Sequence, residues 1–152
     1  MANGVFNIMK GSWRYFCTLP AVTDSIDFTL FKSGIQADDL LNNFDNLASL
    51  KSQNVEADFA NYVRKQINVT GVTGVNITQN NTTNAVDVDV PDQTWGAASP
   101  TNTLAKLIVC YRPVSNSTDS DLIPMFYFDF VGTTNGSDLI AQVNALGLAG
   151  DT

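Results

Sequence analysis

Carboxylates are the side chains of this sequence with the clearest capacity for chemistry. Asp87 and Asp89 lie two residues apart on a predicted strand, so both would project from the same face, and Asp92 follows closely. A carboxylate pair can hydrolyse a glycosidic bond if it faces a cleft and one member has a raised pKa. We favour a simpler interpretation, in which the intervening valines face inward and the aspartates face water.

Calcium binding is a second chemistry that carboxylate oxygens allow. The candidate ligands are Asp87, Asp89 and Asp92 or, alternatively, Asp119 and Asp121. The sequence lacks both the DxDxDG loop and the distal glutamate of an EF-hand. We therefore predict no bound metal and no cofactor.

Histidine is absent from the chain. Its absence removes the Ser-His-Asp and Cys-His nucleophile systems, the zinc sites that contain histidine, and the usual near-neutral general base. The sequence contains neither a GxxxxGK phosphate loop nor a GxGxxG motif after a strand. It therefore predicts a protein that is not an enzyme and that acts by contacting other surfaces.

The charge balance argues against two classes of partner. Eight Lys+Arg stand against fifteen Asp+Glu, which gives a net charge of −7, and no basic run is present to neutralise phosphates. No apolar run reaches the roughly 18 residues of a membrane span, and the start MANGVFNIMKGSW lacks the pattern of a signal peptide. We predict no nucleic-acid partner, no membrane contact, and synthesis in the cytoplasm.

The two cysteines, Cys17 and Cys110, are far apart in the sequence. Cys110 lies in the apolar run LIVCY, which predicts a buried thiol. Because a cytoplasmic protein is kept reduced, we do not expect the two cysteines to form a disulfide.

Large aromatic side chains are candidates for a binding surface. The run Phe126–Phe130 could stack on sugars, but its alternation with Asp129 favours a buried strand or a subunit interface. Trp95 follows PDQT beside a loop, where it would either close the edge of the core or anchor an interface. The predicted interface residues are Trp13, Phe44, Trp95 and Tyr127.

Two segments have the spacing of amphipathic helices. Between residues 4 and 17, apolar residues recur every three or four positions, which predicts a helix that ends before Pro20. Between residues 37 and 51, four leucines and Phe44 repeat at helical spacing, with acidic residues in the first turn.

Apolar runs predict strands over much of the remaining chain. The strands are expected at 25–32, 60–68, 104–112, 122–131 and 139–143, with a polar hairpin between 75–77 and 86–90. This order predicts an α+β fold that is mainly β, an antiparallel sheet or sandwich carrying one or two helices. Residues 1–152 are expected to form one domain, whose Gly/Ala-rich tail 144–152 extends away from the core or against a neighbour.

Four segments carry a family resemblance: MANGVFNIMKG at the start, VPDQTW in the middle, LAKLIVCYRP, and DLIPMFYFDFVGTTNGSDLIAQV. Together they resemble a family of small structural proteins that tailed phages and prophages encode among their virion genes. The resemblance extends from Ala2 to about Val143, and none of its motifs is a catalytic signature. The chain departs from the family pattern in the stretch 69–84, where charge is sparse.

This resemblance implies a virion component and, first of all, a capsid decoration (cement) protein. Such a protein would lie on the capsid surface as a homotrimer and would bind the major capsid protein. Three alternatives remain open: a tail or head–tail connector protein, a carbohydrate-binding module that uses Trp95 or Phe126–Phe130, and a hydrolase that uses Asp87 and Asp89.

Overall fold

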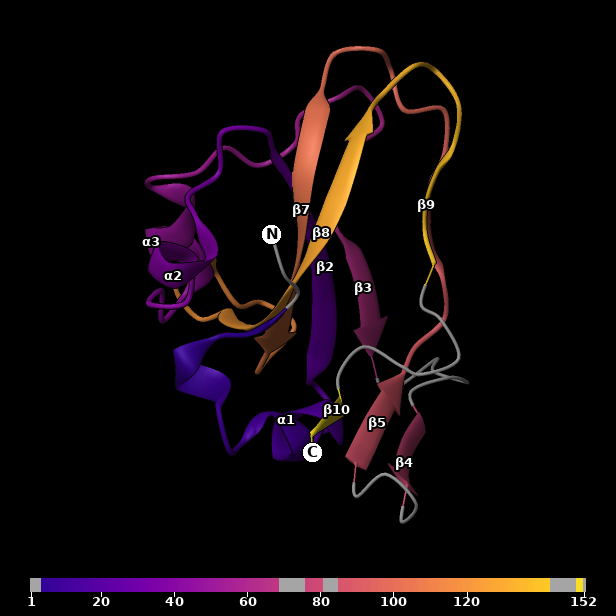
Figure 1. Cartoon of the computed structure of the whole chain (residues 1–152). Helices are drawn as coiled ribbons and strands as arrows, with labels where there is room; N and C mark the ends of the chain where they lie inside the picture. Colours follow the sequence, from indigo (N-terminus) through magenta and orange to yellow (C-terminus); the bar gives the residue numbers. More distant parts are fainter. Residues whose placement is uncertain (1–3, 69–75, 81–84, 143–149, 152) are drawn as a thin grey trace.

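Two long strands with buried apolar side chains form the centre of a five-stranded antiparallel sheet. In the computed structural model, which describes residues 4–68, 76–80, 85–142 and 150–151, the sheet order is β1-β8-β7-β2-β3 (Figure 1). For Asn68, 76–80, 85–89 and 150–151 only the backbone is described. The strands of this sheet are β1 (Gly4–Val5), β2 (Ser25–Lys32), β3 (Lys65–Asn68), β7 (Thr103–Arg112) and β8 (Ile123–Thr133).

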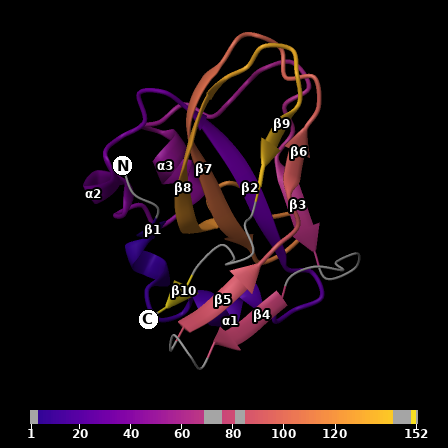
Figure 2. The same cartoon turned by 45° about the vertical axis from the view of Figure 1, so that its right-hand side comes forward.

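Two smaller antiparallel sheets accompany the main one (Figure 2). One pairs β6 (Gln93–Trp95) with β9 (Leu139–Ala141), and the other has the order β10-β5-β4. Its strands are β4 (Asn76–Asn80), β5 (Ala85–Asp89) and β10 (Gly150–Asp151). The predicted α+β class, mainly β with antiparallel sheets, is therefore confirmed, as is pairing within the predicted polar hairpin.

The tail predicted at 144–152 contributes one element to the described chain. Gly150 pairs with Asp87 and Asp151 with Val86, so this part of the tail adds a short strand, β10, beside β5. The expectation that the tail extends away from the core or against a neighbour stays a prediction, to which the structure adds this pairing with β5. Residues 144–149 and 152 fall outside the described residues.

The prediction of one helix over 4–17 is wrong. The segment contains β1, a 3-10 helix η1 (Asn7–Met9) and a short helix α1 (Trp13–Cys17). Gly11 has a φ of +84°, a left-handed conformation that interrupts a right-handed helix. Gly4 pairs with Tyr127 in the sheet, and a Cβ at Gly4 would lie 2.3 Å from the Tyr127 hydroxyl oxygen. Apolar periodicity alone did not reveal these backbone requirements.

The helix predicted over 37–51 is two short helices. These are α2 (Asp38–Leu41) and α3 (Leu47–Lys51), separated by the asparagine-rich turn 42–46. Asn46 begins α3 by accepting a 2.8 Å hydrogen bond at Oδ1 from the Ser49 backbone N–H, a typical N-cap. The strand predicted at 60–68 is also too long, since β3 begins at Lys65 after Asn61, whose φ is +71°.

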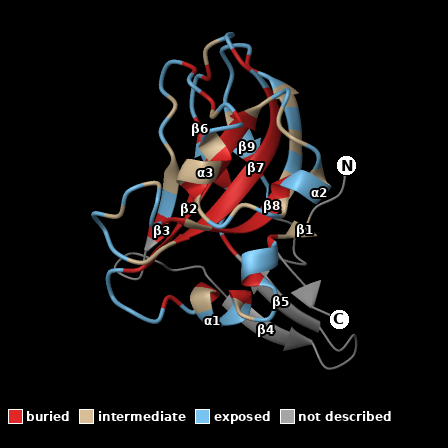
Figure 3. Ribbon diagram, turned by 90° about the vertical axis from the view of Figure 1, so that its left-hand side faces the viewer, coloured by how far each residue is buried: buried red, intermediate tan, exposed pale blue. Residues whose placement is uncertain are grey.

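The main sheet has two faces of different character, because side chains alternate along each strand. The apolar face carries Ile26, Phe28 and Leu30 of β2 with Leu107, Val109 and Tyr111 of β7, and it is covered by α1 and the β6–β9 pair. The mixed face carries Asp27, Thr29 and Phe31 of β2 with Lys106, Ile108, Cys110 and Arg112 of β7. Helices α2 and α3 cover part of the mixed face (Figure 3).

Candidate functional site

Three of the four predicted interface residues, Trp13, Trp95 and Tyr127, are buried within the chain, and a role at an interface stays a prediction. Trp95 is 1% exposed, and its Nε1 donates a 2.9 Å hydrogen bond to the Val63 carbonyl. Trp13 is buried edge-on against Phe126, and Tyr127 is buried against Phe6. Phe44 is half-buried and packs against the apolar cluster under α2 and α3. These rings have their partners within the chain, so little of their surface remains for another protein.

The aromatic run of β8 divides between the two faces of the sheet. Phe126 is buried on the apolar face, and Phe128 and Phe130 pack against the same cluster, whereas Tyr127 points to the mixed face. This arrangement agrees with the buried strand that the sequence offered as one interpretation of Phe126–Phe130. A sugar-stacking platform needs exposed ring faces, which Phe126 and Trp95 do not offer.

Of the five carboxylates singled out from the sequence, the structure describes the side chains of three, Asp92, Asp119 and Asp121. The side chains of Asp87 and Asp89 lie outside the described residues, and Asp92 is exposed. Asp119 is paired with cations, whereas Asp121 Oδ2 accepts hydrogen bonds from the backbone N–H and the hydroxyl of Thr118. Among the residues whose placement is described, no group of three carboxylates or thiols could hold a metal ion.

Both cysteines are buried free thiols. Burial disfavours the thiolate, so it raises the pKa of Cys17 to about 12 and raises that of Cys110 as well. The prediction of a buried Cys110 is confirmed. A high pKa makes each thiol a weak nucleophile, which is the character of a packing residue.

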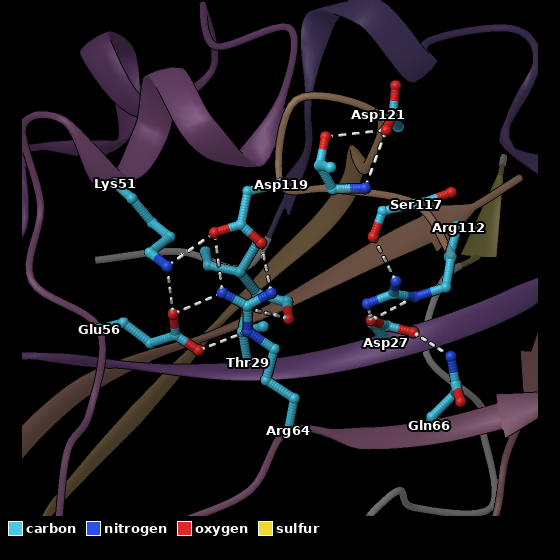
Figure 4. A network of polar contacts seen from close by, with 12 residues as sticks. Asp27, Thr29, Lys51, Glu56, Arg64, Gln66, Arg112, Ser117, Asp119 and Asp121 are labelled. Carbon is cyan, nitrogen blue, oxygen red and sulfur yellow. Dashed lines mark hydrogen bonds and ion pairs between the residues drawn. The ribbon is translucent and has the colours of Figure 1, made fainter. Parts of the chain in front are cut away.

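The densest polar cluster lies on the mixed face, around the guanidinium of Arg64 (Figure 4). Arg64 precedes β3 and donates to Glu56 through Nε and Nη2, both at 2.6 Å. The same guanidinium reaches Asp119 in the loop between β7 and β8, with Nη1 at 2.5 Å from Oδ1. Lys51, the last residue of α3, closes the cluster at 2.7 Å from Asp119 and 3.0 Å from Glu56. We call these four residues the Arg64 cluster.

The Arg64 cluster is continuous with the backbone of the sheet. Tyr62 Oη donates to Glu56 Oε1 at 2.9 Å and accepts from the Leu30 backbone N–H of β2 at 3.0 Å. Burial and the Glu56 charge together raise the pKa of Tyr62, so its hydroxyl keeps its proton. The cluster thus links α3, the loop after β7 and the approach to β3 to one strand of the main sheet.

Opposite charges hold the carboxylates of the Arg64 cluster in the ionised form. Hydrogen bonds from Arg64, opposed by partial burial, lower the pKa of Asp119 to about 2. Burial alone would raise the pKa of Glu56, but the bonds and charges of Arg64 and Lys51 lower it below the usual value. Burial also opposes the charge of Lys51, yet its two carboxylate partners raise its pKa. An acid-pair hydrolase needs one carboxyl with a raised pKa, which is the opposite arrangement.

A second buried ion pair lies near the opposite end of the mixed face (Figure 4). Asp27 Oδ2 accepts from Arg112 through Nε at 2.9 Å and through Nη2, a bidentate geometry. Arg112 Nη1 also donates to the Ser117 carbonyl at 2.9 Å, which fixes the loop after β7 a second time. Gln66 of β3 donates to Asp27 Oδ1 at 3.2 Å, so three adjacent strands share the pair.

Lys106 forms the third ionic contact of the mixed face. Its side chain is 0% exposed, and its Nζ lies 2.8 Å from Asp38 of α2 and 2.5 Å from Asp129 of β8. The ammonium also lies 5.0 Å from the centre of the Tyr127 ring. Burial opposes the charge of Lys106, but the two aspartates raise its pKa. Lys106 therefore connects α2 to the sheet.

The sequence reasoning missed the residues of these ionic contacts. Arg64, Glu56 and Lys51 stand alone in segments that contain no motif, and Asp119 was considered only as a calcium ligand. A usable signal was the low charged fraction of 15%, because a chain with few charges places several of them where they have partners. The pairing itself depends on contacts as distant in sequence as Asp27 and Arg112, which no local pattern reveals.

Comparison with protein-family models, with curated proteins and with solved structures returned no match. Within the described ranges, none of the helices is long and apolar enough to cross a membrane.

Proposed function

We propose that this chain is a non-enzymatic structural protein of a tailed-phage virion, and specifically a capsid decoration protein. In this role it binds the major capsid protein on the outer shell, as a homotrimer, and stabilises the lattice because it binds only the assembled form. The proposal builds on the resemblance of four sequence segments, LAKLIVCYRP among them, to small virion proteins.

The structural observation that carries the proposal is the use of buried charge in this chain. Arg64, Arg112 and Lys106 each form ion pairs that join segments far apart in the sequence. Charged groups that are paired within the chain in this way hold loops in place. A protein that must present one rigid surface to many equivalent sites benefits from such anchoring.

Burial of the aromatic side chains weakens the carbohydrate-binding alternative. Trp95 and Phe126, the two rings best suited to stack on a sugar, are each 1% exposed. A tail or connector protein would use the same rigid surface in fewer copies, so the number of copies separates that role from shell decoration.

The test is the number of copies of this chain in a purified particle, measured by quantitative mass spectrometry against the major capsid protein. A decoration protein is expected near one copy per capsid subunit. A handful of copies per particle would instead assign the chain to the tail or connector, and complete absence from particles would reject the virion role.

A further inference from the structure

Two of the three basic residues that have no ion pair among the described residues lie in one surface segment. Of its eight basic residues, five form ion pairs within the chain: Lys32, Lys51, Arg64, Lys106 and Arg112. The other three, Lys10, Arg14 and Lys65, have no ion pair in the part of the chain that the structure describes. Lys10 and Arg14 are exposed and lie four residues apart, Lys10 between η1 and α1 and Arg14 within α1.

Two exposed apolar side chains belong to the same segment, 8–15, as these two cations. Ile8 is 40% exposed and Tyr15 is 62% exposed, although both belong to segments whose other side is buried. We define Ile8, Lys10, Arg14 and Tyr15 as the basic patch. Tyrosine and arginine, which this patch combines, are enriched among the residues that anchor protein interfaces.

A patch of opposite charge lies beside the basic patch on the same side of the molecule. Asp39 and Leu40 of α2 are exposed, Leu40 by 53%, and Asp45 is exposed in the turn before α3. We define these three residues as the acidic patch. Figure 3 shows α2, the segment after β1 and α1 following one another along this side. Two hydrogen bonds join η1 to the turn after α2: the Asn7 backbone N–H donates to the Asn42 carbonyl at 3.1 Å, and Asn7 Nδ2 donates to Asn43 Oδ1 at 3.0 Å.

We propose that a second copy of this chain docks here, with its acidic patch against the basic patch of the first. The two patches have opposite charge and similar make-up, each combining two charges with at least one exposed large apolar side chain. The two patches are neighbours on one side of the molecule. A second copy rotated onto this side can therefore place its acidic patch, its basic patch or both against the opposite patch of the first copy. The contact also gives Lys10 and Arg14 acidic partners, in a chain whose net charge is −7.

This inference deepens the self-association in the proposed function, because it names the surface through which copies meet. It needs no particle and is tested on the purified full-length chain, so its failure is distinguishable from a failed copy-number measurement. The number of copies follows from the mass of the complex: a pair or a ring of three both place the acidic patch against the basic patch.

The experiment is a charge swap followed by sedimentation equilibrium. The variant Lys10→Glu with Arg14→Glu should raise the dissociation constant at least about tenfold, because attraction becomes repulsion. The variant Asp39→Lys with Asp45→Lys should weaken association similarly. Combining all four changes in one chain restores complementary charges, the net charge of −7 and association close to that of wild type.

The matched control is Lys65→Glu, since Lys65 is the third basic residue without an ion pair and lies on β3. It should leave the dissociation constant unchanged, and circular dichroism should show the same fold for every variant. Wild-type association should weaken as salt rises and screens the contact. A wild-type chain that remains a monomer, or a four-residue swap that fails to restore association, would overturn the inference.

Discussion

The two faces of the main sheet are built by different means, although the same strands supply both. The apolar face excludes water with Ile26, Phe28, Leu107 and Val109 beneath α1 and the β6–β9 pair. The mixed face places ionic contacts between its apolar side chains, and each contact reaches a loop or helix rather than a neighbouring strand alone. Apolar packing is non-directional, whereas a bidentate ion pair fixes position. We infer that the apolar face supplies most of the stability and the mixed face fixes the loops.

The largest effect is expected from a cavity in the apolar face. Phe28→Ala removes a fully buried ring and should lower the free energy of unfolding by about 3–5 kcal/mol. The milder change Ile26→Val on the same strand should cost about 1 kcal/mol. Urea denaturation at neutral pH measures both, and equal losses for the two variants would mean that this face does not pack as described.

A slightly smaller loss, of different origin, is expected on the mixed face. Asp27→Asn leaves the half-buried guanidinium of Arg112 without its buried counter-charge and should cost about 3 kcal/mol. Replacing both partners, Asp27→Leu with Arg112→Met, should recover most of that loss, because no buried charge is then left unpaired. If the double variant is as unstable as the single one, the pair contributes more than mutual neutralisation, and the comparison between the faces must change.

The smallest effect is a difference in acid sensitivity between the faces. The pKa of Asp119 is lowered to about 2 and that of Glu56 lies below its usual value, so both stabilise the folded chain above the unfolded values near 4. That stabilisation is lost as pH falls from about 4 toward 2. Asp119→Asn should therefore flatten the pH dependence of the unfolding free energy over this window, whereas Phe28→Ala should leave the dependence unchanged. Equal slopes in wild type and Asp119→Asn would contradict the described pairing.

The sequence alone was sufficient to predict the long strands that define the main sheet. Period-two alternation placed β2 at its observed bounds, and the apolar runs located β7 and β8 to within two residues. The helices were predicted too long because the apolar spacing continues past Gly11 and through the turn that ends at Asn46. Intrinsic backbone requirements at such positions override side-chain periodicity.

The candidate site was harder to predict from the sequence than the fold. Trp13, Trp95 and Tyr127 were selected for their size, and size favours the core as much as an interface. The Arg64 cluster joins residues 51, 56, 64 and 119, whose proximity exists only after the loops have docked on the sheet. Long-range pairing of isolated charges leaves no periodic signal in a single sequence.

Native-state amide hydrogen exchange tests most directly whether the mixed face holds the loops. The backbone N–H groups of Leu47 and Ala48 in α3 donate to the carbonyls of Leu122 and Asp119 in the loop after β7, so they report on this docking. In an Arg64→Met variant we expect faster exchange at these two amides while the central amides of β2 and β7 keep their protection. Unchanged exchange at Leu47 and Ala48, or equal loss of protection across the whole sheet, would contradict the assignment of the Arg64 cluster as a loop anchor.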